Sequence, residues 1–484
     1  GSYPIESFSR SCGEGSEYTD LLKKLFRVSS GLNEDIVRER AVQTGISGKK
    51  ILIIGAIFLL LTGVFTYPLF FKLSTHIPAF ESTDEPFGAL WNFWYNAFAV
   101  SRGLPLTSCP WIAAPFGIPD TTSAYYVWDF INKTLSSTCG YILAYNLQIV
   151  ASYLLAGLTM FILAWYITKN ALASLIAGII YAFCPYHAVR TWQHLGLALI
   201  QWMPLYILAL LRLHQKQDLK RILAAGLAFF LVAAFDFYYA YFMFLATIVF
   251  IAYILIRKKT RKVKFLGSIA LAFFLSLILL IPSIHVILKG KAAASAQKAG
   301  AFNMFVRPFE DLFAQSARPL SYFLPASTHP VFGSFTTQLI GNDLYGESMT
   351  EHTLYLGIIP LILAFLFFKK RSLLRKSYID SPQEERWIYA QFFGVLLIAS
   401  WIFSQPPWWK IFGLNIPMPS QFLYAILPMF RAYCRFGIVV TLALAILAAL
   451  GFTVLTKRYP GKFRIAFIFT AITLGILFEY WTYP

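Results

Sequence analysis

Residues 51–71 read ILIIGAIFLLLTGVFTYPLFF, an apolar run that contains no charged side chain. A transmembrane helix needs about 20 such residues to cross the hydrocarbon core of a bilayer. This stretch therefore predicts a first membrane span. Ten further apolar segments follow it along the chain, at 142–167, 171–185, 195–212, 222–236, 238–256, 265–288, 353–368, 388–405, 437–456 and 464–480.

The composition agrees with this pattern. Of the 484 residues, 58% are hydrophobic and 13% are charged, and the mean hydropathy is +0.61. Soluble domains carry about 45–50% apolar and about 25% charged residues. One water-soluble core cannot bury this excess, so a soluble cytosolic enzyme is excluded. We expect an all-α polytopic membrane protein with about eleven transmembrane helices, because a bilayer admits only helices or closed barrels.

The basic residues are distributed unevenly along the chain. There are 41 Lys and Arg against 23 Asp and Glu, a net charge of +18. About 29 of the 41 lie in the first 50 residues and in alternate connections between the spans, at Lys169, 212–221, 257–264, 369–386 and 457–464. This alternation fits the positive-inside rule and argues against nucleic-acid binding. It predicts an integral membrane protein, with the N-terminus cytoplasmic and the C-terminus outside.

Two regions are defined by the spans. Residues 1–50 form a polar cytoplasmic segment, in which 17–30 fits either an amphipathic helix on the inner leaflet or a soluble helical tail. Residues 51–484 form the membrane domain, whose long outer loops are 72–141, 289–352 and 406–436. A structureless loop of about 70 residues is improbable, so the first loop should contain interfacial helices.

The first outer loop supplies the candidate catalytic carboxylates, Asp84 and Glu85. They lie just beyond the first span and before an aromatic run. A carboxylate at this boundary can take a proton from an acceptor hydroxyl or hold a divalent cation such as Mg²⁺ or Mn²⁺. The alternative is structural, because Ser82, Thr83 and Asp84 precede Pro86 and would cap a helix.

Outer-side cations form a second group of candidates. His187, Arg190 and His194 have the spacing of one helical face that leads toward Gln201, and Arg431 and Arg435 are four residues apart at the entrance to a span. Clustered cations suit a lipid phosphate, since Arg contacts phosphate through two parallel hydrogen bonds. The alternative is snorkelling and anchoring at the membrane interface.

Two buried or edge carboxylates complete the candidates. Asp236 lies between two apolar segments, where it is either functional or the cap of a helical turn. Glu351 precedes the span at 353–368, where a negative charge favours the helix dipole. The chain contains no Walker A, GxGxxG, GxSxG or HExxH motif, so nucleotide and serine-hydrolase chemistry have no support.

The sequence resembles the GT-C superfamily, polytopic glycosyltransferases that use polyprenyl-phosphate sugars, and within it the YfhO-like bacterial branch. The resembling stretches span nearly all of 51–484: TDEPFGALWNFWYNAF, APFGIPDTTSAYY, AYNLQIVASYLLAGLTMFILAWYIT, IIYAFCPYHAVRTWQHLGLALIQWMPLYILALLRL, FDFYYAYF, LSYFLPASTHPVFG, EHTLYLGIIPLILAFL and LPMFRAYCRFGIVVTLALAILAALGF.

The resemblance implies that the acidic residue of the first outer loop is catalytic or holds a metal, which maps onto Asp84 or Glu85. Related proteins often have Gly-Asp-Pro where this chain has Thr83-Asp84-Glu85-Pro86. Together with Arg190, other residues within the resembling motifs are candidates for binding lipid phosphate or substrate: His194, Gln201, Asp236, Tyr239, Glu351, Arg431 and Arg435.

These observations predict a cell-envelope enzyme that transfers a sugar, with inversion, from a polyprenyl-phosphate donor to a glycan, lipid or protein acceptor on the outer face. Two alternatives remain open. One is a non-catalytic scaffold or lipid-binding subunit of a larger membrane complex. The other is a transporter of a lipid-linked substrate, which would use the same cations without needing Asp84.

Overall fold

A computed structural model describes residues 47–79, 85–104, 109, 111, 114–115, 123–257, 262–296, 307–379 and 384–482. Asp84 and the expected amphipathic segment 17–30 lie outside these residues. The chain divides into two units, residues 1–56 and 57–484. Within the first unit the structure describes only the start of helix α2, and the other described elements belong to the second unit.

Helices account for nearly all of the regular structure that the model describes. The long helices are α2 (Gly48–Phe65), α3 (Glu85–Arg102), α4 (Tyr126–Cys139), α5 (Tyr141–Thr168), α6 (Ala171–Ala182), α9 (Trp202–Gln215), α10 (Leu219–Phe235), α11 (Phe237–Arg257), α12 (Lys262–Leu279), α13 (Ile281–Ala296), α17 (Ile358–Ile379), α18 (Glu384–Phe403), α20 (Gly437–Arg458) and α21 (Lys462–Glu479). Each of the eleven expected spans falls on at least one of them, and 265–288 falls on both α12 and α13, which confirms the all-α class.

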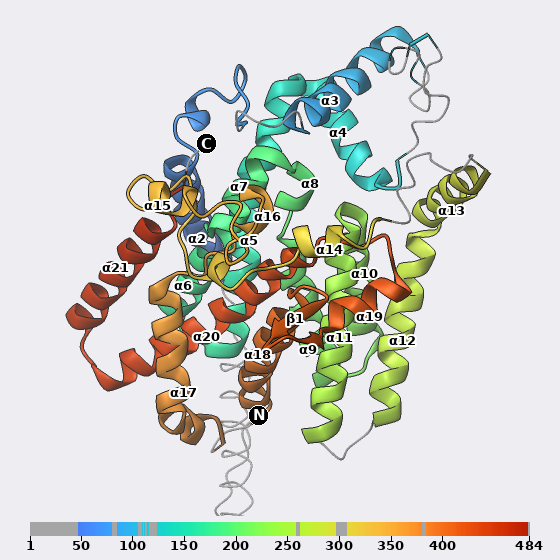
Figure 1. The fold of residues 1–484 in the computed structure, drawn as a ribbon. Helices are drawn as coiled ribbons and strands as arrows, with labels where there is room; N and C mark the ends of the chain where they lie inside the picture. The colour runs from blue at the N-terminus through green and yellow to red at the C-terminus, as the bar shows by residue number, and fades with distance from the viewer. Residues whose placement is uncertain are drawn as a thin grey trace, which may run out of the picture. The chain divides into compact units, whose positions relative to one another are not determined.

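Shorter elements lie between the long helices. They are η1 (Leu69–Phe71), α7 (Pro185–Gln193), α8 (Leu195–Ala198), α14 (Asp311–Ala314), η2 (Leu320–Tyr322), α15 (Gly333–Thr337), α16 (Met349–His352), β1 (Trp408–Ile411), β2 (Leu414–Pro417), α19 (Pro419–Ile426) and η3 (Tyr433–Phe436). Figure 1 shows α7, α8, α14, α15 and α16 in the upper half of the view, with α3 and α4 above them.

Fewer helices than the expected eleven are individually long and apolar enough to cross a membrane. Five single helices qualify within the described residues, and up to seven if two bent pairs each count as one span. The bent pairs are α6 with α7, at 42°, and α12 with α13, at 63°. Pro185 is the first residue of α7 and Pro282 is the second residue of α13, both within the first turn, where a missing backbone N–H costs least. These helices identify an integral membrane protein.

Two expected spans begin later than the hydropathy suggests. The segment expected at 195–212 opens with the short helix α8, and its main helix α9 starts at Trp202. The segment expected at 353–368 starts with five non-helical residues, and α17 begins at Ile358. Both starts are buried, so hydropathy alone could not separate these turns from the helices that come after them.

The core is built around α20. Residues Gly437 to Val454 of this helix are all buried, as expected for a helix that is apolar on every side. It packs against α6, α17 and α18, and Figure 1 shows it between α17 and α18. At Gly451 an added Cβ would lie 1.8 Å from the carbonyl oxygen of Leu363, so the backbones of α20 and α17 touch there.

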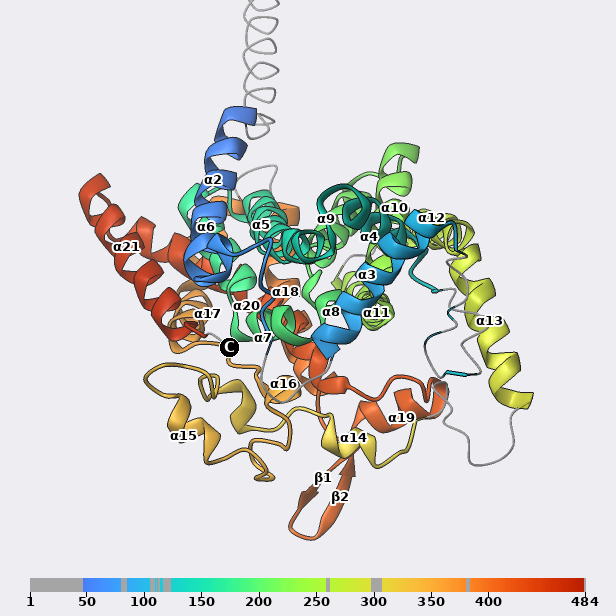
Figure 2. The same ribbon diagram turned by 90° about the horizontal axis from the view of Figure 1, so that it is seen from above.

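The loops at 72–141 and 406–436 contain the ordered structure expected of the first of them, and one element that was not expected. Within 72–141, α3 and α4 pack against each other. Within 406–436, β1 and β2 form an antiparallel hairpin in which Trp408 pairs with Pro417. Its turn residues Phe412 and Gly413 both have positive φ, at 49° and 81°. The hairpin projects away from the helices in Figure 2.

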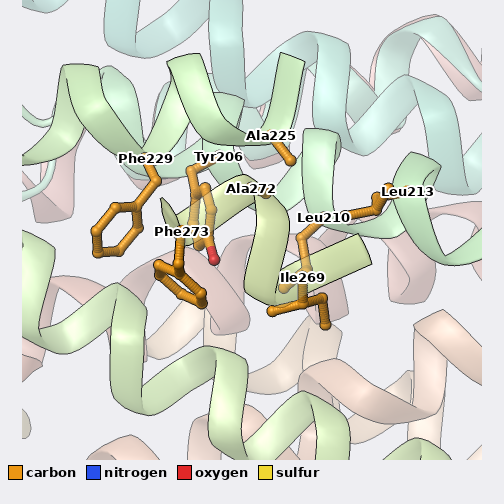
Figure 3. A pocket seen from close by; sticks show the side chains of 8 residues that line it. All are labelled: Tyr206, Leu210, Leu213, Ala225, Phe229, Ile269, Ala272 and Phe273. Carbon is orange, nitrogen blue, oxygen red and sulfur yellow. The ribbon is translucent and has the colours of Figure 1, made fainter. Parts of the chain in front are cut away.

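A cavity between α9, α10 and α12 shows how closely these helices pack. Figure 3 shows its lining, which includes Tyr206, Phe229 and Phe273. Its volume is about 10 Å³, roughly the space that one water needs. This cavity is therefore not a candidate ligand site, and it directs attention to the polar residues at the ends of the helices.

We predict that Gly451→Ala destabilises the protein by about 1–3 kcal/mol, because the new methyl group must push α20 away from the backbone of α17. Thermal melting of the purified protein in detergent measures the effect. Gly267→Ala on α12 is the control, since nothing lies within 4 Å of its Cβ position. Equal melting temperatures for the two variants would contradict the close contact.

Candidate functional site

The centre of the candidate site is the carboxylate of Glu351, on the short helix α16. Arg190 on α7 donates from Nη1 to Oε1 over 3.2 Å and from Nη2 to Oε2 over 2.7 Å. Arg435 on η3 donates from Nη2 to Oε1 over 2.6 Å and from Nε to both oxygens over 3.2 Å. The thiol of Cys434 contacts Oε2 at 3.2 Å. One carboxylate therefore joins segments 84 and 161 residues away from it.

Aromatic rings cover the flat faces of the two arginines. The guanidinium carbon of Arg190 lies 4.9 Å from the ring centre of Tyr186, and that of Arg435 lies 4.8 Å from the ring centre of Tyr238. A cation over an aromatic face is attracted by the quadrupole of the ring. The hydroxyl of Tyr186 lies 3.1 Å from that of Tyr239, which donates to the carbonyl of Leu197 over 2.5 Å. Tyr239 thus supports the site without contacting Glu351.

Charge pairing keeps Glu351 ionised despite its burial. Burial alone would raise the pKa of its carboxyl, but the charges of Arg190 and Arg435 and their hydrogen bonds outweigh burial and hold the pKa well below its usual range. The carboxylate is thus negative at every physiological pH. The sequence pattern gives Glu351 only a favourable position near a helix start, and it does not indicate either arginine as its partner.

The two arginines differ in their access to ligands. The side chain of Arg190 is 0% exposed, and that of Arg435 is 13% exposed. Arg435 uses Nε and Nη2 on Glu351, so its Nη1 takes no part in these contacts. Arg190 is therefore fully enclosed, whereas Arg435 keeps a small exposed fraction. The Nε of Arg190 has no hydrogen-bond partner among the described residues.

A second pair lies at the edge of this cluster. His194 Nε2 is 2.6 Å from Glu85 Oε2, and the side chains are 25% and 56% exposed. Burial lowers the pKa of His194, the hydrogen bond to Glu85 opposes this, and the charges of Arg190 and Arg435 add to the lowering. The Nδ1 of His194 is buried and has no partner in the described part of the chain. A neutral His194 that donates from Nε2 would present Nδ1 as a free acceptor.

Asp236 caps the start of one helix, whereas Gln201 is buried at the start of another. Asp236 Oδ1 accepts from the backbone N–H of Tyr239 over 2.9 Å, so it caps the start of α11. This contact is the helix cap that the structural alternative for Asp236 expects. Its carboxylate also lies within electrostatic reach of Arg435 and Arg190. Gln201 is buried at the start of α9, and its Oε1 has no partner among the residues described.

The expected helical face of cations does not form. Helix α7 ends at Gln193, and the side chains of the three expected residues diverge. The ring of His187 bonds to the carbonyls of Ala182 and Ala198, whereas Arg190 and His194 meet different glutamates. His187 is therefore held by structural contacts, which also include the hydroxyl of Ser152 at 3.1 Å from Nε2. A neutral ring can donate to only one of the two carbonyls.

The expectation that Arg431 and Arg435 lie on one helical face is also wrong. Residues 427–432 are not helical, so the spacing of four does not place the two side chains on one face. Arg431 instead pairs with Asp311 on α14, and its backbone N–H donates to the hydroxyl of Tyr238 over 3.3 Å. Pro428 in this segment explains the failure, since proline interrupts a helix.

The aromatic run of the first outer loop packs mainly against itself. Trp91 stacks on Tyr95 with ring centres 5.0 Å apart, and Trp94 stacks on Phe98 at 5.2 Å. Tyr95 is buried in a small cluster with Cys109. Cys109 and Cys139 are both free thiols. Where the chain is described, no three His, Cys, Asp or Glu side chains converge on a point that could hold a metal ion.

Comparisons with known proteins place the chain in a family. A family model described as "Domain of unknown function (DUF6311)" matches residues 130–476, well over half of the sequence. The chain therefore belongs to this family, which leaves the YfhO-like branch an expectation. Among curated proteins, none matches the sequence.

Two solved structures cover most of this chain. One is the archaeal oligosaccharyltransferase AglB from Archaeoglobus fulgidus in complex with an inhibitory peptide and a dolichol-phosphate, at TM-score 0.49 and 13% identity, covering 89% of this chain and 55% of that one. The other is ArnT from Cupriavidus metallidurans bound to undecaprenyl phosphate, at TM-score 0.46 and 14% identity, covering 88% and 64%. This chain thus spans less than two thirds of either protein, and at these scores the likeness assigns it no activity.

Breaking the buried Glu351 cluster should cost far more stability than breaking the partly exposed pair of Arg431 and Asp311. We predict that Glu351→Gln lowers the free energy of unfolding by about 3–5 kcal/mol, because it leaves two buried guanidinium groups without their carboxylate. Asp311→Asn removes the partly exposed partner of Arg431 and should cost at most about 1 kcal/mol. Thermal melting in detergent compares them, and similar losses would refute the central role of Glu351.

The lowered pKa of His194 predicts a pH dependence of stability. When pH falls below the ordinary histidine pKa of about 6.5, the unfolded chain takes up a proton that the folded His194 resists, so the folded state loses stability. The melting temperature of the wild type should therefore fall relative to that of His194→Gln between pH 7.5 and pH 5.5. The exposed His285 supplies the control variant, His285→Gln. A constant difference between wild type and His194→Gln would contradict the pKa shift.

Proposed function

We propose that this member of the DUF6311 family is an inverting membrane glycosyltransferase that moves a sugar from a polyprenyl-phosphate donor to an acceptor hydroxyl. The observation that carries the proposal is the position of the Glu85–His194 pair within electrostatic reach of Arg435 and Arg190. A group able to accept a proton and a group able to bind a phosphate are thereby brought together from α3, α7 and η3.

The proton acceptor in this proposal is a dyad. Glu85 accepts from Nε2 of His194 and fixes the orientation of the ring, which leaves Nδ1 free to take the proton of the acceptor hydroxyl. A lowered pKa keeps His194 neutral and able to act as a base. The sequence pattern alone makes Glu85 and His194 separate candidates with separate roles. The contact between them makes them one unit, in which Glu85 positions His194.

The leaving group requires positive charge. As the acceptor oxygen bonds to the anomeric carbon of the sugar, the bond from that carbon to the phosphate oxygen breaks and its electron pair stays on the polyprenyl phosphate. Preorganised donors that face developing negative charge are a major source of rate acceleration. Arg435 is the partly exposed arginine and has Nη1 available for this phosphate, whereas the fully buried Arg190 acts through Glu351.

Several further features support the proposal without carrying it. The sequence resemblance to the GT-C superfamily spans nearly all of 51–484 and includes the segment that contains Glu85. The protein is an integral membrane protein, so a lipid-linked donor reaches it within the bilayer. The alternation of basic connections supports placing this site on the outer face of a bacterial inner membrane, where the acceptor would be a glycan, a lipid or a protein.

A divalent cation remains part of the proposal only at Asp84 or Glu85. Glu85 faces His194, and these two side chains by themselves make an incomplete ligand set. Asp84 lies outside the described residues. The acceptor proton therefore has a route through His194 that needs no metal, and a chelation experiment decides whether Mg²⁺ or Mn²⁺ contributes to activity.

The test is sugar transfer by the purified full chain in liposomes, with a panel of radiolabelled polyprenyl-phosphate sugars and a mixed acceptor extract. Glu85→Gln and His194→Gln should each lower the rate by about 10²–10⁴-fold, and Arg435→Lys by about 10²–10³-fold. Asp84→Asn tests the neighbouring carboxylate. Melting temperatures establish that the variants fold.

Glu310→Gln is the matched control, because Glu310 is an exposed carboxylate of the second outer loop. Transfer by wild type with unchanged rates in the Glu85 and His194 variants would refute the dyad. No transfer or donor hydrolysis with any sugar, by protein that still binds polyprenyl phosphate, would favour a scaffold or a lipid-binding subunit. Movement of an intact lipid-linked substrate across the bilayer would favour a transporter.

A further inference from the structure

A cavity of about 270 Å³ lies between the segment 65–79, helix α5 and helix α7. Its lining includes Lys72 and His76 from the segment, Tyr153 from α5, and Thr191 and Trp192 from α7. This volume is far more than a single water needs. Thr191 and Trp192 directly follow Arg190 in the chain, so α7 contributes both to this cavity and to the Glu351 cluster.

Lys72 and His76 lie on a single backbone turn. The backbone N–H of His76 donates to the carbonyl of Lys72 over 3.0 Å, a spacing that brings residues four apart to the same side. The hydroxyl of Thr75 lies 2.8 Å from His76 Nδ1 and fixes the ring. The lining therefore presents two nitrogen groups that can hydrogen bond to one anion.

This turn is anchored to α5. The side-chain amide of Asn146 donates to the carbonyls of Leu73 and His76 over 2.7 Å and 2.6 Å. Asn146 is fully buried, so these bonds replace water for both backbone carbonyls. The turn that presents Lys72 and His76 is thus held in place before any ligand arrives, and preorganisation of this kind favours binding.

The charge of this cavity is not neutralised by its own lining, which contains no acidic residue. No ion pair to Lys72 occurs within the described residues. Apart from Thr66 and Thr191, the remaining wall is apolar and aromatic and includes the buried residues Leu69, Ile149 and Tyr153. Such a wall suits a hydrocarbon chain better than a free ion.

The position of the cavity along the chain also favours a lipid as its ligand. It begins at the end of α2, where Tyr67 and Phe71 are 68% and 77% exposed. Exposed aromatic residues at the end of a membrane span are typical of the bilayer interface, and basic residues there attract lipid phosphate. An anionic lipid could therefore enter from the bilayer with its head group toward Lys72.

We propose that this cavity binds a single anionic amphiphile, with a phosphate monoester between Lys72 and His76 and an apolar chain against Leu69 and Ile149. This site is distinct from the Glu351 cluster and goes beyond the proposed glycosyl transfer, because binding here requires no reaction. The ligand class is a lipid phosphate, and free phosphate lacks the part that the apolar wall would contact.

The experiment measures binding to the purified full chain by native mass spectrometry, with three probes at equal concentration. The probes are dioctanoyl phosphatidic acid, dioctanoylglycerol and inorganic phosphate. Wild type should bind the phosphatidic acid at least about tenfold more tightly than either of the others, since only it has both parts. The double substitution Lys72→Ala with His76→Ala should weaken that binding about tenfold or more.

Two further variants make the result decisive. Ala79→Trp fills the cavity without removing a charge and should abolish phosphatidic acid binding. Lys410→Ala removes an exposed lysine from the distant strand β1 and should leave it unchanged. Unchanged binding in both the double variant and Ala79→Trp would overturn the proposal, as would equal weakening by Lys410→Ala. Tighter binding of inorganic phosphate than of phosphatidic acid would overturn the lipid assignment. None of these outcomes depends on sugar transfer.

Discussion

The buried ion cluster of Glu351 constrains more of the structure than any other polar contact. A carboxylate and two guanidinium groups lose most of their hydration here, and only close bidentate geometry compensates for that loss. The geometry can be satisfied only if α7, α16 and η3 meet at one point. Because η3 leads directly into α20, the cluster also fixes the start of the central helix of the core.

The shape of the α6–α7 pair is explained by the same requirement. A straight continuation of α6 would be an ordinary apolar span, but the chain breaks at Cys184 and Pro185 and turns by 42° into α7. The nine residues of α7 are all buried, including Arg190. A buried arginine is tolerated when its charge is paired and its face is covered, and Glu351 and Tyr186 do both. The bend brings the charged residue to its partner.

Hydropathy was sufficient to predict the helices, because the cost of exposing backbone groups to lipid leaves few alternatives. It could not predict which polar residues meet. Glu85 and His194 are separated by 109 positions, and nothing in the local pattern of either indicates the other. The spacing of Arg431 and Arg435 gave a wrong prediction, because it places both side chains on one face only in a helix, and Pro428 prevents a helix there. Only the turn at Phe412 and Gly413 left a local signal, since glycine at a positive φ is typical of a two-residue hairpin.

In the proposed displacement, the charges of the candidate site would let His194 act both on the acceptor hydroxyl and on the leaving phosphate. Arg190 and Arg435 both pair with Glu351, and Asp236 lies within electrostatic reach of them. A bound phosphate would add negative charge to the site. That charge would favour the protonated form of His194, whose pKa is lowered by burial and by the charges of Arg190 and Arg435. The proton taken from the acceptor hydroxyl would therefore remain on His194 while negative charge develops on the leaving phosphate. In this proposal the base would become the cation that, together with Arg435, stabilises the leaving phosphate.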